Sequence, residues 1–474
     1  MERKSGVLMH VSSLFGKYSS GSFGEEAKYF VDFLADCGFS YWQVLPFCMT
    51  DEYNSPYKSY SSFSGNPYFV DLPTLYEKGL LTAEELKAAE QSSPYLCEFD
   101  RLQEERFELL KAASKRVLDK APIKTFIENS PYLDAFCRFM ALREANSGTP
   151  WQTWTVETPD ESILFAWQFI QYEFFAQWQE IRRYANGKGI KLIGDIPIYV
   201  ALDSADVWSA PDQFQLDKKQ NPTHVAGVSP DYFSADGQLW GNPLYNWKAM
   251  KQDGYRWWCD RIRHMATMFD TVRIDHFRAF ASYWSIPASS ETAKAGKWIK
   301  GPGLPFIKAI KAAAGKTEII AEDLGDITPD VYKLVQDSGF PGMKVFQFGF
   351  LSDDNSTHLP HNYPANAVAY TGTHDNDTLR GWLAHASPRE RQKAMTYLQA
   401  ERGEELPRKM MLAALASVCD TCILPLQDIL GLSSEARINI PSTLGGNWQW
   451  RATALPDPRT AADLKYYTTL YERL

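Results

Sequence analysis

The sequence predicts an α/β protein whose core is a single (β/α)8 TIM barrel, with large, mostly helical insertions after the second and third strands. Two observations lead to this fold class. Eight short apolar runs, several rich in β-branched residues, occur along the chain, and helical stretches separate many of them. Three of the runs end in carboxylate-bearing segments, and a barrel of this kind presents catalytic side chains at the carboxyl ends of its strands.

The first three strands are widely spaced along the chain. Residues 6–10 are predicted as the first strand, and an amphipathic helix follows over about 25–36, with Gly38 as its stop signal. Residues 40–46 form the second predicted strand, and the third is expected only at 190–200. The long interval between the second and third strands therefore indicates an insertion.

Two insertions account for the surplus length. Residues 47–189 are predicted as an inserted helical subdomain that begins with a polar, aromatic loop at 54–68. Residues 201–270 are predicted as a second inserted subdomain, made of loop and bordering the cleft, because long loops at the carboxyl side of barrel strands usually build the site. Both belong to one elaborated catalytic barrel over 1–474. Within the first insertion, helical periodicity covers about 82–91, 100–118, 131–145 and 162–184.

The remaining strands follow at shorter intervals. Strands four to eight are predicted at 271–274, 318–321, 343–348, 367–371 and 421–426. Helical stretches lie between several of these neighbours, for instance at 305–314, 328–337 and 388–400. Alternation of strand and helix is what the barrel requires, and about 250 residues are enough to build one.

Carboxylates end the fourth, fifth and seventh predicted strands: Asp275, Glu322 and Asp375. In a barrel all three would lie on one rim, where two carboxylates about 5–5.5 Å apart suit retaining glycoside chemistry. The acid of such a pair needs a raised pKa, from burial or a neighbouring carboxylate. The nucleophile must stay ionised, and Arg273, on the same face of the strand as Asp275, would favour that.

Metal binding is the alternative interpretation of the same region. Carboxylates and histidines could in principle ligate zinc or another cation. Barrel metallohydrolases usually bring a His-x-His from their first strand, whereas His10 stands alone here. We therefore expect no metal and no cofactor, with single histidines donating hydrogen bonds to substrate. The residues open to both interpretations are Asp275, His276, Glu322, His374 and Asp375.

Composition narrows the function classes further. Hydrophobic residues make up 45% and charged residues 23%, which allows a large core, and the aromatic content of 14% suits a sugar-binding cleft. With a net charge of −9 and no long basic block, nucleic acid and anionic membranes are not expected partners. The N-terminal apolar run is too short for a signal peptide, and seven scattered cysteines indicate reduced thiols. We expect a cytoplasmic protein.

Several motifs resemble those of the amylomaltases, the 4-α-glucanotransferases of glycoside hydrolase family 77 in the α-amylase superfamily. The resemblance extends from the first strand almost to the end of the chain. The loops containing Trp240 and Asn447 are its more specific parts, because carboxylate motifs alone would indicate only the superfamily. The motifs are Arg273-Ile-Asp275-His276, 321–325, 372–377, 55–57, 65–68, 194–199, 240–245 and 445–448.

This resemblance implies a role for each matching position. Asp275 would be the nucleophile, Glu322 the general acid and base, and Asp375 the transition-state stabiliser. Tyr57 and Trp240 would be stacking platforms for sugars. Members of this family lack the C-terminal β-sandwich domain common in α-amylases, and no room remains for one after the eighth strand. The residues that would contact sugars flanking the scissile bond are Asp195, Arg273, His276, His374 and Asn447.

The expected activity is transfer of 1,4-α-glucan segments between maltooligosaccharides or starch-type glucans, through a covalent glycosyl-Asp275 intermediate. The donor would be an α-1,4-glucan and the acceptor glucose or a maltooligosaccharide, held by loops at 54–68 and 231–245. Two alternatives stay open: an α-glucan hydrolase of the same superfamily, with water as acceptor, and a non-catalytic glucan-binding barrel. The presence of all three carboxylates argues against the second.

Overall fold

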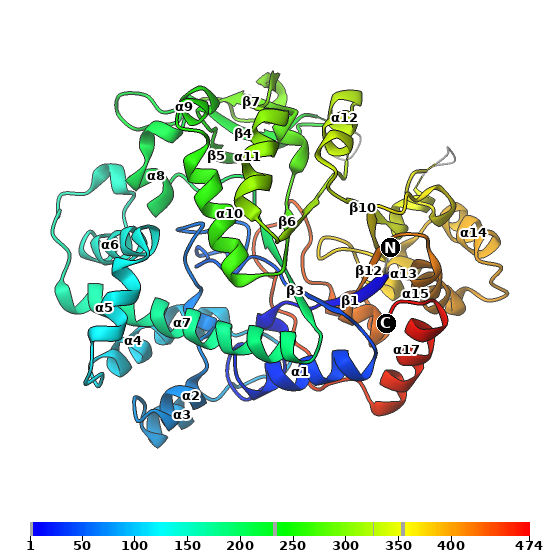
Figure 1. Cartoon of the computed structure of the whole chain (residues 1–474), viewed down its shortest axis with the longest axis horizontal. Helices are drawn as coiled ribbons and strands as arrows, with labels where there is room; N and C mark the ends of the chain where they lie inside the picture. Colours follow the sequence, from blue (N-terminus) through cyan, green and yellow to red (C-terminus); the bar gives the residue numbers. More distant parts are fainter. Residues whose placement is uncertain (1–2, 231–234, 326, 352–355) are drawn as a thin grey trace.

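A barrel of parallel strands forms the centre of the computed structural model, which describes residues 3–230, 235–325, 327–351 and 356–474. In this part of the chain, eight strands pair in the order β10-β11-β12-β1-β2-β3-β6-β9 (Figure 1). The predicted (β/α)8 barrel is therefore confirmed. The strands are β1 (Lys4–Leu8), β2 (Tyr41–Gln43), β3 (Lys191–Ile196), β6 (Thr271–Ile274), β9 (Glu318–Ala321), β10 (Gly342–Val345), β11 (Ala367–Tyr370) and β12 (Thr421–Pro425).

The barrel closes at the seam between β9 and β10 without a regular ladder. The Ala321 N–H donates to the carbonyl oxygen of Pro341 at 2.9 Å. The Met343 N–H donates to Oδ1 of Asp323 at 2.7 Å. Asp323, the second residue after β9, therefore supplies through its side chain an acceptor that a strand carbonyl would normally provide.

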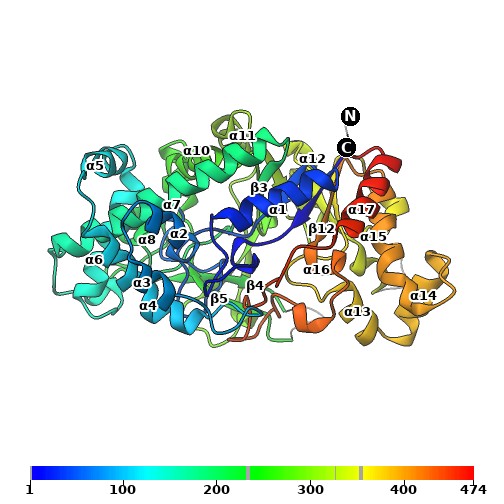
Figure 2. The ribbon, with the colours of Figure 1, turned by 90° about the horizontal axis from the view of Figure 1, so that it is seen from below.

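Helices surround the barrel. Helix α17 packs against both α15 and α1, so the C-terminal helix completes the ring beside the first one (Figures 1 and 2). The described residues between β10 and β11 form 3₁₀ turns, at Phe346–Phe350 and Pro360–Asn362, instead of an α-helix. The surrounding helices are α1 (Glu25–Asp36), α7 (Glu161–Gly187), α10 (Arg256–Met268), α11 (Leu304–Ala314), α12 (Pro329–Ser338), α13 (Leu379–His385), α14 (Pro388–Tyr397), α15 (Leu406–Ala416), α16 (Leu426–Ile429) and α17 (Pro458–Leu470).

Local chemistry explains where these elements start and stop. Glu25 and Glu26 lie in the first turn of α1, where carboxylates interact favourably with the helix dipole, and Gly38 follows its end with a left-handed φ of 72°. Strand β3 ends before Pro197, which has no N–H to donate, so it is shorter than the predicted 190–200. Gly194 is required within β3, because a Cβ there would lie 2.3 Å from the ring of Phe269.

The segment between β2 and β3 is mostly helical. Four of its helices match the predicted stretches, with α4 ending earlier than expected and α7 continuing to Gly187. Helices α2 and α5, of 6 and 8 residues, were not predicted. The helices before α7 are α2 (Leu72–Glu77), α3 (Ala83–Ala88), α4 (Phe99–Ser114), α5 (Ala121–Glu128) and α6 (Pro131–Ala145).

The expectation that residues 201–270 are loop was wrong. This segment contains helices α8 (Ala205–Ser209), α9 (Trp247–Gln252) and α10, and strands β4 (His224–Val228) and β5 (Gln238–Pro243). In the described chain the two strands belong to an antiparallel sheet of order β5-β4-β7-β8. Strands β7 (Ser282–Pro287) and β8 (Lys297–Lys300) come from the connection after β6, so β4 pairs with a distant strand, β7, on one side and with the nearby β5 on the other.

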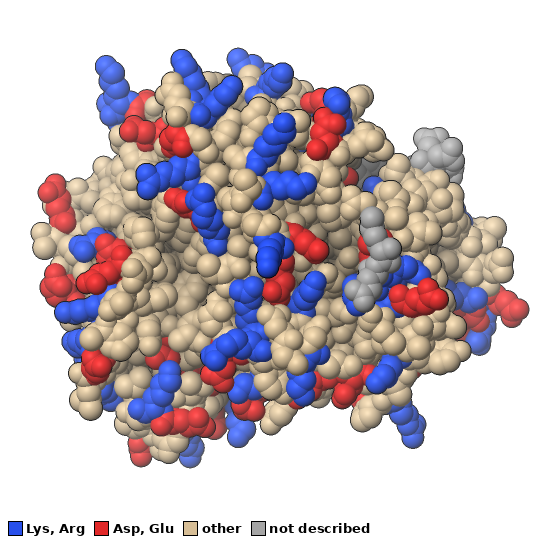
Figure 3. All heavy atoms as spheres, in the orientation of Figure 1, with Lys and Arg blue, Asp and Glu red and all other residues tan. Residues whose placement is uncertain are grey.

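The molecule has two distinct ends along the barrel axis. In Figure 2 the two termini lie together at the top, and β4 and β5 lie at the bottom. The Lys4 ammonium donates to the carbonyl oxygen of Leu474 at 2.8 Å, which joins the termini. On the face shown in Figure 3, acidic and basic side chains are interspersed, as on an ordinary solvated surface. Among the described residues, no helix combines the length and apolar character of a membrane span.

Candidate active site

The three predicted carboxylates lie at the carboxyl ends of three barrel strands. Asp275 directly follows β6, Glu322 directly follows β9, and Asp375 lies in the loop after β11. Because all barrel strands run parallel, these ends meet at one rim. The fold therefore brings together three side chains that are up to 100 positions apart in the sequence.

Arg273 links two carboxylates beneath the rim. Its Nη2 donates to Oδ1 of Asp275 at 2.9 Å, and its Nη1 donates to both oxygens of Asp195, at 2.8 and 2.7 Å. The guanidinium side chain is only 4% exposed. Burial alone would lower its pKa, but Asp195 and Asp275 outweigh that and raise the pKa well above its usual value. Arg273 is therefore a fixed positive charge in contact with Asp275.

Asp195 lies inside the barrel instead of in the cleft. Its side chain is completely buried, and both oxygens accept hydrogen bonds from Arg273. Oδ2 also accepts a hydrogen bond from the Tyr57 hydroxyl at 2.6 Å. Burial raises the Asp195 pKa, and the Arg273 charge opposes this. Asp195 therefore contacts Arg273 and Tyr57 and is not among the residues that line the cleft, whereas the resemblance implied a sugar contact.

Glu322 is a buried carboxyl group held by main-chain donors. Its Oε2 accepts the His276 N–H at 2.7 Å, and its Oε1 accepts the Leu324 N–H at 2.8 Å. Burial and the negative charge of Asp275 raise its pKa to about 8, although Arg273 and the two N–H groups act in the opposite direction. Glu322 is therefore protonated at neutral pH, which is the state a general acid needs.

Asp375 is the exposed member of the three. Its side chain is 48% exposed, and Oδ1 lies 3.4 Å from Nε2 of His374. The same oxygen accepts a hydrogen bond from Nδ2 of Asn439 at 2.7 Å. Arg437 donates from Nη2 to the carbonyl oxygen of Asp375, also at 2.7 Å. A segment far along the chain thus holds both the main chain and the side chain of Asp375.

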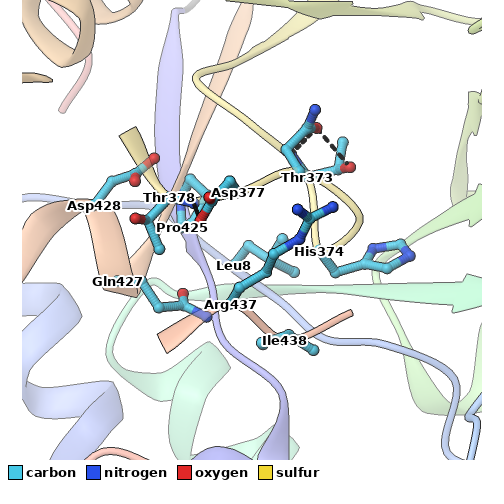
Figure 4. A pocket seen from close by; sticks show the side chains of 11 residues that line it. Leu8, Thr373, His374, Asp377, Thr378, Pro425, Gln427, Asp428, Arg437 and Ile438 are labelled. Carbon is cyan, nitrogen blue, oxygen red and sulfur yellow. Dashed lines mark hydrogen bonds between the residues drawn. The ribbon is translucent and has the colours of Figure 1, made fainter. Parts of the chain in front are cut away.

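The loop that carries His374 and Asp375 is fixed from below by one buried carboxylate. Asp428 accepts from the Thr371 hydroxyl at 2.7 Å and from the Leu379 N–H at 2.7 Å, so it joins the two ends of this loop. Figure 4 shows the small cavity beneath the loop, with His374 pointing away from Asp428. The burial of Asp428 raises its pKa to about 6.

Aromatic rings line one side of the cleft. The rings of Tyr57 and His374 are stacked, with centroids 5.0 Å apart and planes at 18°. The ring centroid of Trp448 lies 6.0 Å from that of Tyr57 and 5.9 Å from that of His374. Flat surfaces of this kind pack well against the C–H faces of sugars. Tyr57 thus combines a ring at the cleft with a hydroxyl that holds Asp195.

His276 and Trp240 contact each other through their rings. The His276 backbone is left-handed, with φ of 50°, which turns its N–H toward Glu322. Its ring centroid lies 4.9 Å from the Trp240 ring in an edge-on arrangement. Burial lowers the His276 pKa to about 4, so the ring is neutral at pH 7 and has one donor and one acceptor nitrogen.

A cleft of about 430 Å³ joins these groups, a volume within the usual range for ligand sites. Four predicted site residues are not among those that line it, namely Asp195, Arg273, His276 and Glu322. Residues 231–234 of the expected 231–245 loop lie outside the described residues. The predicted residues that line the cleft are Tyr57, Trp240, Asp275, His374, Asp375 and Asn447, with Gln238 and Asn242 also contributed by the 231–245 segment.

Asn447 closes its own loop. Its Oδ1 accepts the Ile440 N–H at 3.0 Å, and its Nδ2 donates to the Thr443 hydroxyl at 3.0 Å. The loop therefore keeps its shape through bonds within the 440–447 segment, and Asn447 borders the cleft at its end.

Sequence reasoning missed the residues that support Asp375. Asn439 and Arg437 lie in an irregular segment without periodicity, so no pattern marked them. Asp428 lies in α16, three residues after the end of β12, so a carboxylate close to a strand end was the available signal. Tyr199, whose ring lies 6.2 Å from that of Trp240, belongs to a motif used for the resemblance but received no role.

The metal interpretation finds no arranged ligand set in the described part of the chain. No group of three or more histidine, cysteine or acidic side chains there has the geometry to hold an ion. Both oxygens of Glu322 accept main-chain N–H groups, and Oδ1 of Asp275 accepts from Arg273. The site instead has the features of acid, base and nucleophile chemistry.

Comparisons of the sequence and of the structure with known proteins find similar glucan-transferring enzymes. A family model described as 4-alpha-glucanotransferase matches residues 9–456. The 4-alpha-glucanotransferase of Streptococcus pneumoniae is 42% identical over 494 aligned positions, covering 100% of this chain and 98% of that protein. That of Thermus thermophilus is 41% identical over 506 positions, covering 100% of both chains. An amylomaltase from Streptococcus agalactiae, solved in complex with acarbose, matches with a TM-score of 0.95 at 37% identity, covering 99% of each chain.

Proposed function

This chain belongs to the 4-alpha-glucanotransferase family, and from that premise we propose that it works by retaining double displacement, with Asp275 as nucleophile, Glu322 as acid and base, and Asp375 as transition-state stabiliser. The observation that carries this assignment is the contrast between two neighbouring carboxyl groups. Glu322 is buried with a pKa raised to about 8, whereas Asp275 accepts a hydrogen bond from a buried Arg273. Environments that separate two carboxyl groups in this way mark the acid and the nucleophile.

In the first step, an oxygen of Asp275 attacks the anomeric carbon of the donor glucan. The bond from that carbon to the 4-oxygen of the next sugar breaks, and the Glu322 proton moves to the departing oxygen. A glycosyl ester on Asp275 remains, and the leaving chain has a new free 4-hydroxyl. Glu322 is now a carboxylate, ready to act as a base.

In the second step, the 4-hydroxyl of an acceptor sugar attacks the same anomeric carbon. Its proton returns to Glu322, the new glycosidic bond forms, and the ester bond to Asp275 breaks. Two inversions leave the α configuration unchanged. We assign to Asp375 the stabilisation of the positive charge that develops on the sugar ring in both steps, since one of its oxygens faces no protein donor among the described residues.

The remaining cleft residues supply sugar contacts. Tyr57 and Trp240 would stack on sugar rings, and His374, His276 and Asn447 would exchange hydrogen bonds with hydroxyl groups. Arg273 would influence the sugar indirectly, through its hydrogen bond to Asp275. Asp195 would hold the Arg273 side chain in position. Acceptor sugars stacked between the 54–68 and 235–245 segments would be held at high effective concentration, which favours transfer over hydrolysis.

Trapping the intermediate tests this proposal. Glu322→Gln removes the proton donor, but an α-maltosyl fluoride needs little acid assistance because fluoride leaves readily. The variant should therefore form the glycosyl ester and hydrolyse it slowly. Mass spectrometry of a protease digest should find the added maltosyl mass on the peptide that contains residue 275. A label on the 322 region of the wild-type protein, or no label at all, contradicts the assignment.

We further propose a cytoplasmic role in the turnover of starch-type glucans and maltooligosaccharides. All seven cysteines, each within the described ranges, are free, as expected in a reducing compartment. Burial raises the pKa of both the Cys48 and the Cys422 thiols to about 12, which keeps them unreactive. Cell fractionation tests this location. Glucanotransferase activity should be recovered in the same fraction as a cytosolic marker enzyme and not in the membranes or the medium.

A further inference from the structure

The segment 437–448 runs along the loop that carries Asp375 and borders the cleft. Two hydrogen bonds join the segment to this residue: Asn439 Nδ2 donates to Oδ1, and Arg437 Nη2 donates to the main-chain carbonyl, each at 2.7 Å. Arg437 Nε also donates to the carbonyl oxygen of Asn439 at 2.8 Å. Arg437 therefore donates hydrogen bonds to the main-chain carbonyls of both Asp375 and Asn439, and the Asn439 side chain donates to the Asp375 carboxylate.

We propose that Asn439 is a positioning residue that orients the Asp375 carboxylate toward the reacting sugar, with Arg437 holding the two residues in register. This inference rests on the proposed role of Asp375. The main chain around Asp375 is already anchored by Asp428, and Figure 4 shows Arg437 extended toward Thr373 of the same loop. The side chain of Asp375 is nearly half exposed, so packing does not restrict its rotation.

The hydrogen bond from Asn439 makes the two oxygens of Asp375 different. Oδ1 receives the Asn439 amide and lies near Nε2 of His374. No described residue donates to Oδ2, which leaves this oxygen available to the substrate. An amide is well suited to the task, because it donates without adding a charge.

Two other roles for Asn439 are conceivable, namely direct contact with a sugar and maintenance of the loop. Asn439 lines the cleft, so the first must be tested. The loop itself depends on Asn447, which bonds Ile440 and Thr443, and on the Trp448 N–H, which donates to the Ile438 carbonyl at 2.6 Å. Removing the Asn439 side chain therefore leaves these bonds in place.

Kinetics of two variants separate positioning from structural support. Loss of one hydrogen bond to a charged group predicts that Asn439→Ala lowers kcat about 10- to 100-fold, with KM and Tm close to wild type.

The Asn439→Asp variant should lose more activity than Asn439→Ala at pH 7.5, because two carboxylates then repel each other. As the pH falls to 5, its activity relative to wild type should recover, since the introduced carboxyl group, once protonated, can donate to Asp375 as the amide does. The exposed Asn129→Ala is the control and should match wild type. An Asn439→Asp defect that is equal at both pH values overturns the inference.

A double-mutant cycle tests whether the effect passes through Asp375. With α-maltosyl fluoride as donor, Asn439→Ala should cause no further loss in an Asp375→Ala background. Effects that multiply in full would show that Asn439 acts on the sugar itself, and the inference would be wrong. An Asp375→Ala variant with wild-type activity would instead refute the proposed role of Asp375, and the inference with it.

Discussion

Replacing Glu322 by Gln should change how the stability of this protein depends on pH. The pKa of Glu322 is raised from 4.5 to about 8 by burial and by Asp275. Between these values the folded state binds a proton that the unfolded state does not. The free energy of unfolding therefore receives a contribution that is complete below pH 4.5 and is lost as the pH rises through about 8.

The structure gives the size of this effect. Each unit of pKa shift corresponds to about 1.4 kcal/mol, so the raised pKa allows a change of at most about 5 kcal/mol. Because part of this shift comes from the neighbouring charge of Asp275, we expect a smaller change, about 2–4 kcal/mol, between pH 5 and pH 9. Gln cannot titrate, so the variant lacks this change.

A second, pH-independent term comes from hydrogen bonding. Both oxygens of Glu322 accept main-chain N–H groups, from His276 and Leu324. The amide of Gln has only one acceptor, so one of these N–H groups loses its partner, at a cost of about 1–3 kcal/mol. Glu322→Gln should therefore be less stable than wild type at pH 5, and the difference should shrink or reverse by pH 9.

Urea unfolding at pH 5, 7 and 9 measures this difference. Glu318→Gln is the matched control, because Glu318 is an exposed carboxylate at the start of the same strand. Its stability difference from wild type should stay within about 0.5 kcal/mol at every pH. A Glu322→Gln difference that is also constant across the range would refute the raised pKa, and with it the assignment of Glu322 as the acid.

Four further predictions follow from the site. Asp275→Asn keeps the shape of the side chain but removes the attacking charge, so turnover should fall by about three orders of magnitude or more, with a normal circular-dichroism spectrum; retention of a tenth of wild-type turnover would disprove the assignment. Maltotriose should give glucose and a ladder of longer maltooligosaccharides with almost constant reducing ends, whereas reducing ends that rise with bond cleavage would indicate hydrolysis. Arg273→Lys should lower the free energy of unfolding by about 3–5 kcal/mol in urea, since one ammonium cannot serve both Asp195 and Asp275; an unchanged value would contradict the paired-carboxylate arrangement. Prolonged EDTA treatment and desalting should leave activity unchanged, and a loss that zinc or manganese restores would revive the metal interpretation.

Much of the barrel was predictable because its signals are local. The strand at 271–274 alternates β-branched residues with Arg273 and ends at Asp275, and the structure places β6 at these positions. Helix α1 matches its predicted bounds because its apolar spacing and Gly38 are read within a few turns. The rim position of Asp275, Glu322 and Asp375 then followed from the parallel order of barrel strands.

Pairings between distant segments were not predictable in the same way. Strand β4 pairs with β7, and helices α9 and α10 and strand β6 lie between them in the sequence. Its short run, His224–Val228, carries too weak a pattern to be recognised without that partner. The seam between β9 and β10 also departs from a regular ladder, because Asp323 replaces a strand as acceptor.

By itself the sequence determined which residues can do chemistry and at which strand ends they stand, because side-chain type and short-range periodicity are properties of neighbouring positions. Only the tertiary structure decided what each of them does. Burial beside Asp275 raises the pKa of Glu322, and both oxygens of Asp195 accept hydrogen bonds from Arg273. Asn439 comes to hold Asp375 across 64 positions of chain. Burial, charge proximity and hydrogen bonds between distant segments exist only after folding, so no local pattern can reveal them.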